Sequence, residues 1–208
     1  MELEDYILAH GDAEPDYLAK INRKTHLKMI NPRMLSGHLQ GRVLSMLSKM
    51  IQPERILEVG TYTGYSALCL AEGLSAIGKL QTIECDDELE EFIHENIESS
   101  PYKGQITLHI GDAIKLIPEM NDVFDLVFLD ADKREYQVYY DAVFPKLRKG
   151  GFMLVDNTLW DGKVLLEVDE KDNQTEAIRK FNDYVAADSR VEKLILPLRD
   201  GLTLIRKK

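Results

Sequence analysis

The sequence has no long hydrophobic run and few cysteines. Its 208 residues contain no apolar stretch near the roughly 20 residues that a membrane-spanning helix requires. Two cysteines, Cys69 and Cys85, are too few for a disulfide framework, and both lie in apolar stretches, so we expect small buried thiols. Residues 1–10 are acidic and have no apolar segment typical of a secretory signal. These absences favour a cytoplasmic protein with no membrane partner.

The chain also has fewer basic than acidic residues. The chain has 26 Lys and Arg against 36 Asp and Glu, which gives a formal net charge of −10. An acidic chain is a poor non-specific binder of nucleic acid, so no nucleic-acid partner is expected, although a local basic patch is still compatible with this total. The length fits a single domain, residues 1–208. We expect a helical N-terminal segment, residues 1–53, followed by an α/β core, residues 54–208.

The hydrophobic pattern changes near residue 55. Before it, helical spacing covers Pro15 to about Thr25 and Gly37 to Met50. After it, short apolar runs alternate with helical stretches, as expected for a parallel sheet covered on both faces. The predicted strands are Ile56–Val59, Leu80–Ile83, Ile106–Ile110, Leu126–Leu129 and Phe152–Val155, and the predicted helices are Tyr65 to about Leu74, Asp87–Glu98, Ala113–Glu119 and Glu135–Leu147.

Two turns complete this pattern. Gly150 and Gly151 predict a turn into the fifth strand. Asp200-Gly201 joins two strand patterns, Val191–Leu196 and Leu202–Ile205, and is typical of a hairpin. The last strand is therefore expected to run antiparallel, which makes the sheet mixed.

A glycine loop follows the first predicted strand. Gly60 and Gly64 are four residues apart, a different spacing from the G-x-G-x-x-G of dinucleotide-binding proteins. The amides at the start of the next helix could face a diphosphate or an amino-acid carboxylate. Glu58, inside the strand, needs a partner. A ligand α-ammonium would provide one, and backbone amides are the alternative.

Acidic residues follow the second and third predicted strands. Glu84 ends the second strand, where a carboxylate can accept both ribose hydroxyls of a nucleotide. Asp86 and Asp87 follow it, and we expect them to cap the next helix. Asp112 follows the third strand and can cap a helix, contact an adenine edge, or do both.

Oxygen ligands follow the fourth and fifth predicted strands. Asp130 comes directly after one, and Asp156 and Asn157 come after the other. The carboxyl ends of neighbouring parallel strands meet at one edge, so these side chains form an oxygen-rich half-shell that suits Mg²⁺. The alternative is two helix-capping acids.

Lys133 lies nearby, where a divalent cation lowers a lysine pKa and favours a general base. A solvated surface lysine is its alternative.

Three segments together are similar to the cation-dependent O-methyltransferases, which include catechol and caffeoyl-CoA O-methyltransferases. They are residues 57–66 (LEVGTYTGYS), residues 129–133 (LDADK) with Tyr136, and residues 156–162 (DNTLWDG), and the bacterial and plant branch resembles them most. The resemblance implies a Rossmann-like, S-adenosylmethionine-dependent methyltransferase fold. That fold has a seven-stranded mixed sheet with an antiparallel last strand, preceded by N-terminal helices. The residues it places around S-adenosyl-L-methionine are Met34, Glu58, Gly60, Tyr62, Tyr65, Ser66, Glu84, Asp112, Ala113 and Asp130.

The resemblance also implies a reaction. Asp130, Asp156 and Asn157 bind Mg²⁺ or another divalent cation, Lys133 is the catalytic base, and the substrate is a small molecule with vicinal aromatic hydroxyls. Members of this branch are typically homodimers, and residues 37–50 offer a candidate surface, unless that helix packs on the sheet.

Two rival functions remain at this point. A nicotinamide-dependent oxidoreductase requires a tighter glycine fingerprint and has no use for paired metal ligands. A partner-binding protein without catalysis should lack one of the metal ligands or the base, and this sequence has all three candidate metal ligands and the candidate base.

Overall fold

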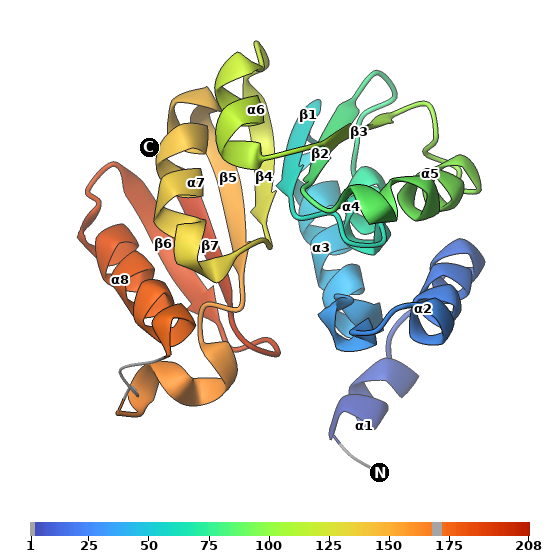
Figure 1. The fold of residues 1–208 in the computed structure, drawn as a ribbon, viewed down its shortest axis with the longest axis horizontal. Helices are drawn as coiled ribbons and strands as arrows, with labels where there is room; N and C mark the ends of the chain where they lie inside the picture. Colours follow the sequence, from blue (N-terminus) through green and yellow to red (C-terminus); the bar gives the residue numbers. More distant parts are fainter. Residues whose placement is uncertain (1–2, 168–171) are drawn as a thin grey trace.

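One seven-stranded sheet organises the chain. The computed structural model describes residues 3–167 and 172–208 (Figure 1). The strands lie in the order β3-β2-β1-β4-β5-β7-β6, and β7 pairs antiparallel with both β5 and β6. The predicted mixed sheet with an antiparallel last strand is confirmed. The strands are β1 Arg55–Val59, β2 Lys79–Glu84, β3 Ile106–Ile110, β4 Phe124–Leu129, β5 Leu147–Asp156, β6 Val191–Leu196 and β7 Leu202–Lys207.

Helices cover both faces of this sheet (Figure 1). Along β4, Val127 and Leu129 face one core, with α7 and α8, and Leu126 and Phe128 face the other, with α3 and α4. This alternation is what a doubly covered parallel sheet requires. The α-helices are α1 Leu3–Ala9, α2 Asp16–Lys28, α3 Gly37–Ile51, α4 Tyr65–Ala71, α5 Glu90–Glu98, α6 Ala113–Glu119, α7 Tyr136–Val143 and α8 Asn173–Ala187. Short 3₁₀ turns are η1 Pro32–Met34, η2 Asp87–Leu89, η3 Lys133–Glu135, η4 Phe144–Lys146 and η5 Trp160–Leu165.

Several predicted helix ends are wrong. The helix predicted to reach Leu147 ends at Val143, because Pro145 has no amide hydrogen to continue the ladder. The helix predicted to reach about Leu74 ends at Ala71. The next residue, Glu72, is the C-cap and keeps helical dihedral angles (φ −59°, ψ −23°), and its carboxylate binds Arg42 and Lys49 of α3. The helix predicted from Asp87 begins as η2 and continues as α5, and Asp86 caps it as expected, accepting from the amide of Glu88.

Two further predictions are corrected. Gly150 and Gly151 lie within β5 and do not precede it. Phe124 pairs with Leu147 while Leu126 pairs with Phe152, so β5 bulges between those pairs, and Gly150 takes the positive φ (75°) that the bulge requires. Cys69 is buried, but Cys85 is exposed, because it lies just beyond the end of β2.

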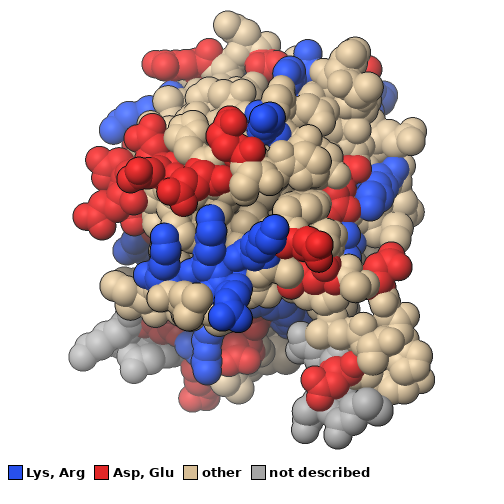
Figure 2. Space-filling view, turned by 90° about the vertical axis from the view of Figure 1, so that its right-hand side faces the viewer, with Lys and Arg blue, Asp and Glu red and all other residues tan. Residues whose placement is uncertain are grey.

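Charge is unevenly distributed on the surface. Figure 2 shows Lys and Arg gathered in a band on the face that carries α2 and α5, beside a group of acidic side chains. In the sequence, α2 contains Lys20, Arg23, Lys24 and Lys28, and Lys24 lies 3.7 Å from Glu95 of α5. The net acidic charge therefore does not describe every face. Within the described residues, no helix is long and apolar enough to span a membrane.

Candidate active site

The carboxyl ends of the parallel strands bring the predicted residues to one edge. Val59 pairs with Ile83 of β2 and with Leu129 of β4, so Gly60 lies between Glu84 and Asp130. Leu129 also pairs with Val155, which places Asp130 beside Asp156. Strand order reverses between β1 and β4, and ligands of open α/β sheets bind outside such a reversal point. The sheet topology and the predicted side chains therefore indicate the same edge.

The glycine loop passes very close to β4. Gly60 has φ 95°, and a Cβ built there would lie 2.0 Å from the backbone oxygen of Asp130, so no other residue fits. Gly64 has φ 83° and precedes α4 directly, where helix amides are free to bind a ligand. Tyr62 also has positive φ (52°), and its hydroxyl donates to the carbonyl of Asn31 (3.1 Å). This bond ties the loop to the segment that contains Met34.

The side chains of this region differ in access. Met34 is 59% exposed, which leaves it open to a ligand. Tyr65 is fully buried, packs against Gly41 of α3 and donates its hydroxyl to Glu14 (2.5 Å). Tyr65 can therefore contact a cofactor at the strand edge only through its backbone. Ser66 is nearly buried beside Glu58.

Glu84 is held mainly by backbone amides, and its Oε1 also accepts from the thiol of Cys85 (3.6 Å). Its Oε2 accepts from Thr61 (3.2 Å) and Tyr62 (2.7 Å), and its Oε1 accepts from Cys85 (2.9 Å) and Asp86 (3.0 Å). The carboxylate thus clamps the glycine loop to the end of β2. A ribose that binds Glu84 must share these oxygens or replace one of the loop amides.

Glu58 is a buried acid with incomplete hydrogen bonding. Its Oε2 accepts from the hydroxyl of Thr82 (2.6 Å), and within the described residues its Oε1 has no partner. Burial, partly offset by the Ser66 and Thr82 hydroxyls, raises the pKa of Glu58 to about 8. The alternative of an acid satisfied by backbone amides is wrong for Glu58, and its pairing with a cationic ligand stays a prediction.

The third strand contributes a helix cap. Asp112 accepts from the amide of Ile114 (3.0 Å) and lies 3.3 Å from the ammonium of Lys115. Ala113 begins α6 and is nearly buried. The capping half of the Asp112 prediction is confirmed, and its contact with adenine stays a prediction.

Asp130, Asp156 and Asn157 form the candidate metal centre. Asp156 is 4% exposed, and burial, together with the negative charge of Asp130, raises its pKa to about 7. Asn157 has φ 57°. Its side-chain nitrogen, Nδ2, donates to Oδ2 of Asp200 (3.5 Å), so its side-chain oxygen, Oδ1, remains for another partner. The described residues hold no cluster of three His, Cys, Asp or Glu side chains arranged for a metal. Two crowded carboxylates and an amide oxygen nonetheless suit a hard divalent cation.

Lys133 is not a surface lysine. The residue is 9% exposed, its Nζ lies 2.7 Å from Oδ1 of Asp130, and its ammonium lies 5.0 Å from the centre of the Tyr136 ring. The Tyr136 hydroxyl donates to the carbonyl of Asp156 (3.0 Å). Lys133 is therefore placed beside the candidate metal ligands, as a base at that position must be.

The side chains that support Asp156 were not predicted from the sequence. Gln40 of α3 donates to Asp156 (2.7 Å), and Arg199, in the β6–β7 turn, donates to Gln40 (3.1 Å). One signal was present: Gln40 lies four residues before Leu44 on the apolar stripe of α3, where a polar side chain requires a partner. No local signal marks Arg199.

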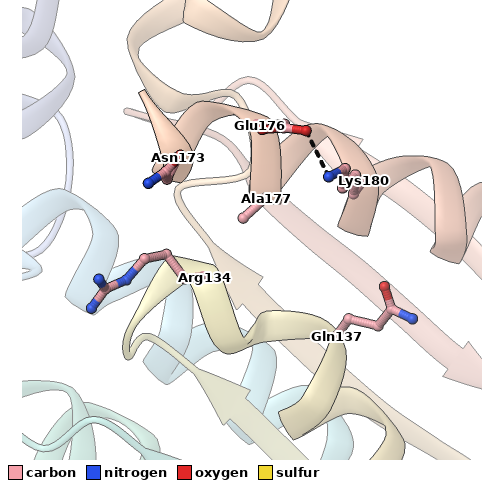
Figure 3. A pocket seen from close by; sticks show the side chains of 6 residues that line it. All are labelled: Arg134, Gln137, Asn173, Glu176, Ala177 and Lys180. Atoms are coloured by element: carbon pink, nitrogen blue, oxygen red, sulfur yellow. Dashed lines mark ion pairs between the residues drawn. The ribbon is translucent and has the colours of Figure 1, made fainter. Parts of the chain in front are cut away.

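A separate hollow of about 330 Å³ lies between η3–α7 and α8 (Figure 3). Its charged side chains already have partners: Arg134 binds Asp132, and Lys180 lies 2.6 Å from Glu176. No predicted site residue of the described chain lines it. The strand edge is therefore preferred as the site on its chemistry. The hollow is lined by Arg134, Gln137, Asn173, Glu176, Ala177 and Lys180.

Comparisons with known proteins agree on one family. A family model described as O-methyltransferase matches residues 9–208. Caffeoyl-CoA O-methyltransferase 1 of Zea mays is 34% identical over 99% of this chain and 84% of its own length. Catechol O-methyltransferase of Niastella koreensis is 32% identical over 79% of this chain and 78% of its own. The structure of the O-methyltransferase TomG from Streptomyces achromogenes, in complex with SAM, has a TM-score of 0.91 and 28% identity, and covers 100% of this chain and 99% of that one.

Proposed function

This chain belongs to the S-adenosylmethionine-dependent O-methyltransferases, and we propose that it methylates a hydroxyl of a catechol-like small molecule with the help of a divalent cation. The observation that carries the finer proposal is the group formed by Asp130, Asp156 and Lys133. Two of these are carboxylates at adjacent strand ends, and the third is a buried lysine that contacts one of them. An enzyme that only had to bind S-adenosylmethionine would have no need for this arrangement.

The cofactor side of the proposal rests on the glycine loop. We assign the binding of S-adenosylmethionine to Met34, Gly60, Tyr62 and Ser66, with Tyr65 and Ala113 contributing backbone atoms. Glu58 provides an acceptor for a cationic group of the cofactor, since its Oε1 has no partner within the described residues. Glu84, Asp112 and Asp130 complete the nucleoside and sulfonium sides.

The candidate metal ligands and Lys133 are assigned to deprotonation of the acceptor hydroxyl. Asp130, Asp156 and Asn157 would hold a divalent cation such as Mg²⁺, which, when bound, would lower the pKa of a phenolic hydroxyl of the acceptor. Lys133, which pairs with Asp130, has to reach this step as a neutral amine, with its own proton given up to solvent. Lys133 then accepts the phenolic proton at Nζ. The oxygen attacks the sulfonium methyl, the carbon–sulfur bond breaks, and the products are a methyl ether and S-adenosylhomocysteine.

A methyl-transfer screen tests this proposal. Catechols, flavonoids and hydroxycinnamoyl-CoA thioesters are offered with S-adenosylmethionine, with Mg²⁺ or with a chelator, and S-adenosylhomocysteine is measured. We expect Mg²⁺-dependent turnover of acceptors with adjacent hydroxyls and none of the matched monohydroxy acceptors. Equal turnover of both acceptor types would contradict the chelating substrate.

We also propose a homodimer, a single domain over residues 1–208 and, on composition alone, a cytoplasmic location. Leu44 of α3 lies in the same core as Phe128 of β4, so one face of α3 packs on the sheet, as the competing view of this helix holds. The other face of α3 exposes Met46 (57%) and Met50 (75%), and Met46 and Ile7 of α1 line a hollow of about 250 Å³. Light scattering tests the dimer, and a mass near 24 kDa at micromolar concentration would contradict it.

A further inference from the structure

Gln40 is a buried polar side chain that none of the assigned roles uses. It is 1% exposed, lies on α3 outside the α/β core, and donates from Nε2 to Oδ2 of Asp156 (2.7 Å). The backbone amide of Asn157 donates to the other oxygen, Oδ1 (2.8 Å). Each oxygen of Asp156 thus has one fixed donor and retains acceptor capacity for a cation. These two bonds set the plane of the carboxylate.

Arg199 determines which way the Gln40 amide faces. Its Nη1 donates to Oε1 of Gln40 (3.1 Å) and also to the carbonyls of Leu35 (3.1 Å) and Ser36. A guanidinium can only donate, and an ionised carboxylate can only accept. The amide oxygen of Gln40 must therefore face Arg199, and its NH₂ group must face Asp156.

The turn that carries Arg199 also supports the loop after Asp156. The carbonyl of Asp200 accepts from the amides of Leu159 (2.7 Å) and Trp160 (3.1 Å), and the carbonyl of Gly201 accepts from Thr158 (3.1 Å). Arg199 itself has φ 48°, an uncommon value for a residue other than glycine. The turn is thus anchored to the ligand loop by its backbone and to α3 by one side chain.

We propose that Gln40 is a positioning residue that orients Asp156 toward the divalent cation, with Arg199 fixing the Gln40 amide. The inference rests on the proposed metal-dependent function and adds to it a residue of the N-terminal helical segment. Partners that orient a metal ligand typically change metal affinity or activity by about 10- to 100-fold when removed. A residue that merely fills space between α3 and β5 would not alter metal affinity in this way.

The test measures Mn²⁺ binding to the cofactor-free protein by electron paramagnetic resonance of the free ion. Gln40→Met keeps the side-chain length and removes both hydrogen bonds, and we expect about 10- to 100-fold weaker Mn²⁺ binding. Arg199→Met should weaken binding less, because Gln40 can still reach Asp156. Ser48→Ala is the matched control, since Ser48 is also buried on α3 but donates to the carbonyl of Leu70 (2.6 Å). Its Mn²⁺ affinity should stay within twofold of wild type.

Calorimetry with S-adenosylmethionine and melting curves accompany each variant. Unchanged cofactor affinity together with weakened Mn²⁺ binding in Gln40→Met supports the inference. Mn²⁺ affinity within twofold of wild type in that variant overturns it and leaves the proposed function intact. Parallel loss of Mn²⁺ affinity in Ser48→Ala also overturns it, since the effect is then general destabilisation. Absence of Mn²⁺ binding by wild type contradicts the metal-dependent function itself. If Gln40→Met does not fold, Arg199→Met decides, and unchanged Mn²⁺ affinity there overturns the inference.

Discussion

The two halves of the strand edge hold their carboxylates in different ways. On the cofactor side, Glu84 accepts from four backbone amides, and the most distant in sequence, that of Thr61, is 23 residues away. On the metal side, Asp156 accepts from one neighbouring amide and from Gln40, 116 residues away. A carboxylate held by backbone tolerates changes in surrounding side chains, whereas one held by a distant side chain does not. The metal half should therefore be the more sensitive to substitution outside the core.

The largest expected effect is on the metal side, at Lys133. Lys133→Ala should lower turnover by about 10²- to 10⁴-fold, the usual range for a positioned acid–base group. Cofactor affinity should change little, because Asp130 is the one residue assigned to the cofactor with which the Lys133 amine has a hydrogen bond in the described structure. Lys180→Ala is the control, since Lys180 is 70% exposed and pairs with Glu176. Steady-state rates decide, and a Lys133→Ala enzyme within a few-fold of wild type would show that the cation alone deprotonates the substrate.

A second effect tests the backbone-held carboxylate on the cofactor side. Glu84→Ala should weaken S-adenosylmethionine binding by roughly 2–4 kcal/mol, because it removes hydrogen bonds to a buried charged group and releases the loop amides of Thr61 and Tyr62. Asp86→Ala removes only a helix cap and should leave affinity nearly unchanged. Titration calorimetry compares the two. The ribose role would pass to Asp86 if that variant, and not Glu84→Ala, lost affinity.

The smallest effect is a pH dependence from Glu58. Its folded-state pKa, about 8, lies above the unfolded value of 4.5, so the cofactor-free protein keeps a proton there below pH 8. A cationic cofactor group favours the ionised form, so affinity should rise with pH by up to about tenfold per unit and level off above pH 8. Glu58→Gln should remove this dependence. A wild-type affinity that is flat from pH 6 to pH 8 would contradict the pairing.

The same raised pKa affects stability. A group with a raised folded pKa contributes stability that is complete below its unfolded pKa and is lost as pH rises through the folded value. The melting temperature of the cofactor-free wild type should therefore fall more steeply between pH 5 and pH 9 than that of Glu58→Gln. Melting curves of the two proteins across this range provide the measurement.

The comparison of the two halves also explains what the sequence could predict. The glycine loop, the strand ends and the Asp200-Gly201 hairpin depend on contacts between near neighbours, and period-two and turn patterns record such contacts. The roles of Gln40 and Arg199 depend on how α3 and the β6–β7 turn pack against β5. That packing joins residues more than 100 positions apart. No spacing rule reaches that distance.

Boundary errors have a similar origin. The bulge at Gly150 exists because β5 pairs with β4 on both sides of an irregularity. From the two glycines alone, this position was predicted to be a turn. Cys85 is exposed because β2 ends one residue before it, a detail that the apolar run does not reveal. Tyr65 turns into the core because Gly41 of α3 leaves room for its ring.

Removal of the metal shows whether methyl transfer by this protein depends on a divalent cation. The protein is treated with a chelator, shown to be metal-free by elemental analysis, and supplied with S-adenosylmethionine and a catechol acceptor. We predict no formation of S-adenosylhomocysteine, full recovery on addition of Mg²⁺, and a cofactor affinity that changes little, because Asp130 is the one residue assigned to both ligands. Full turnover by the metal-free protein would contradict the role of Asp130, Asp156 and Asn157 as metal ligands.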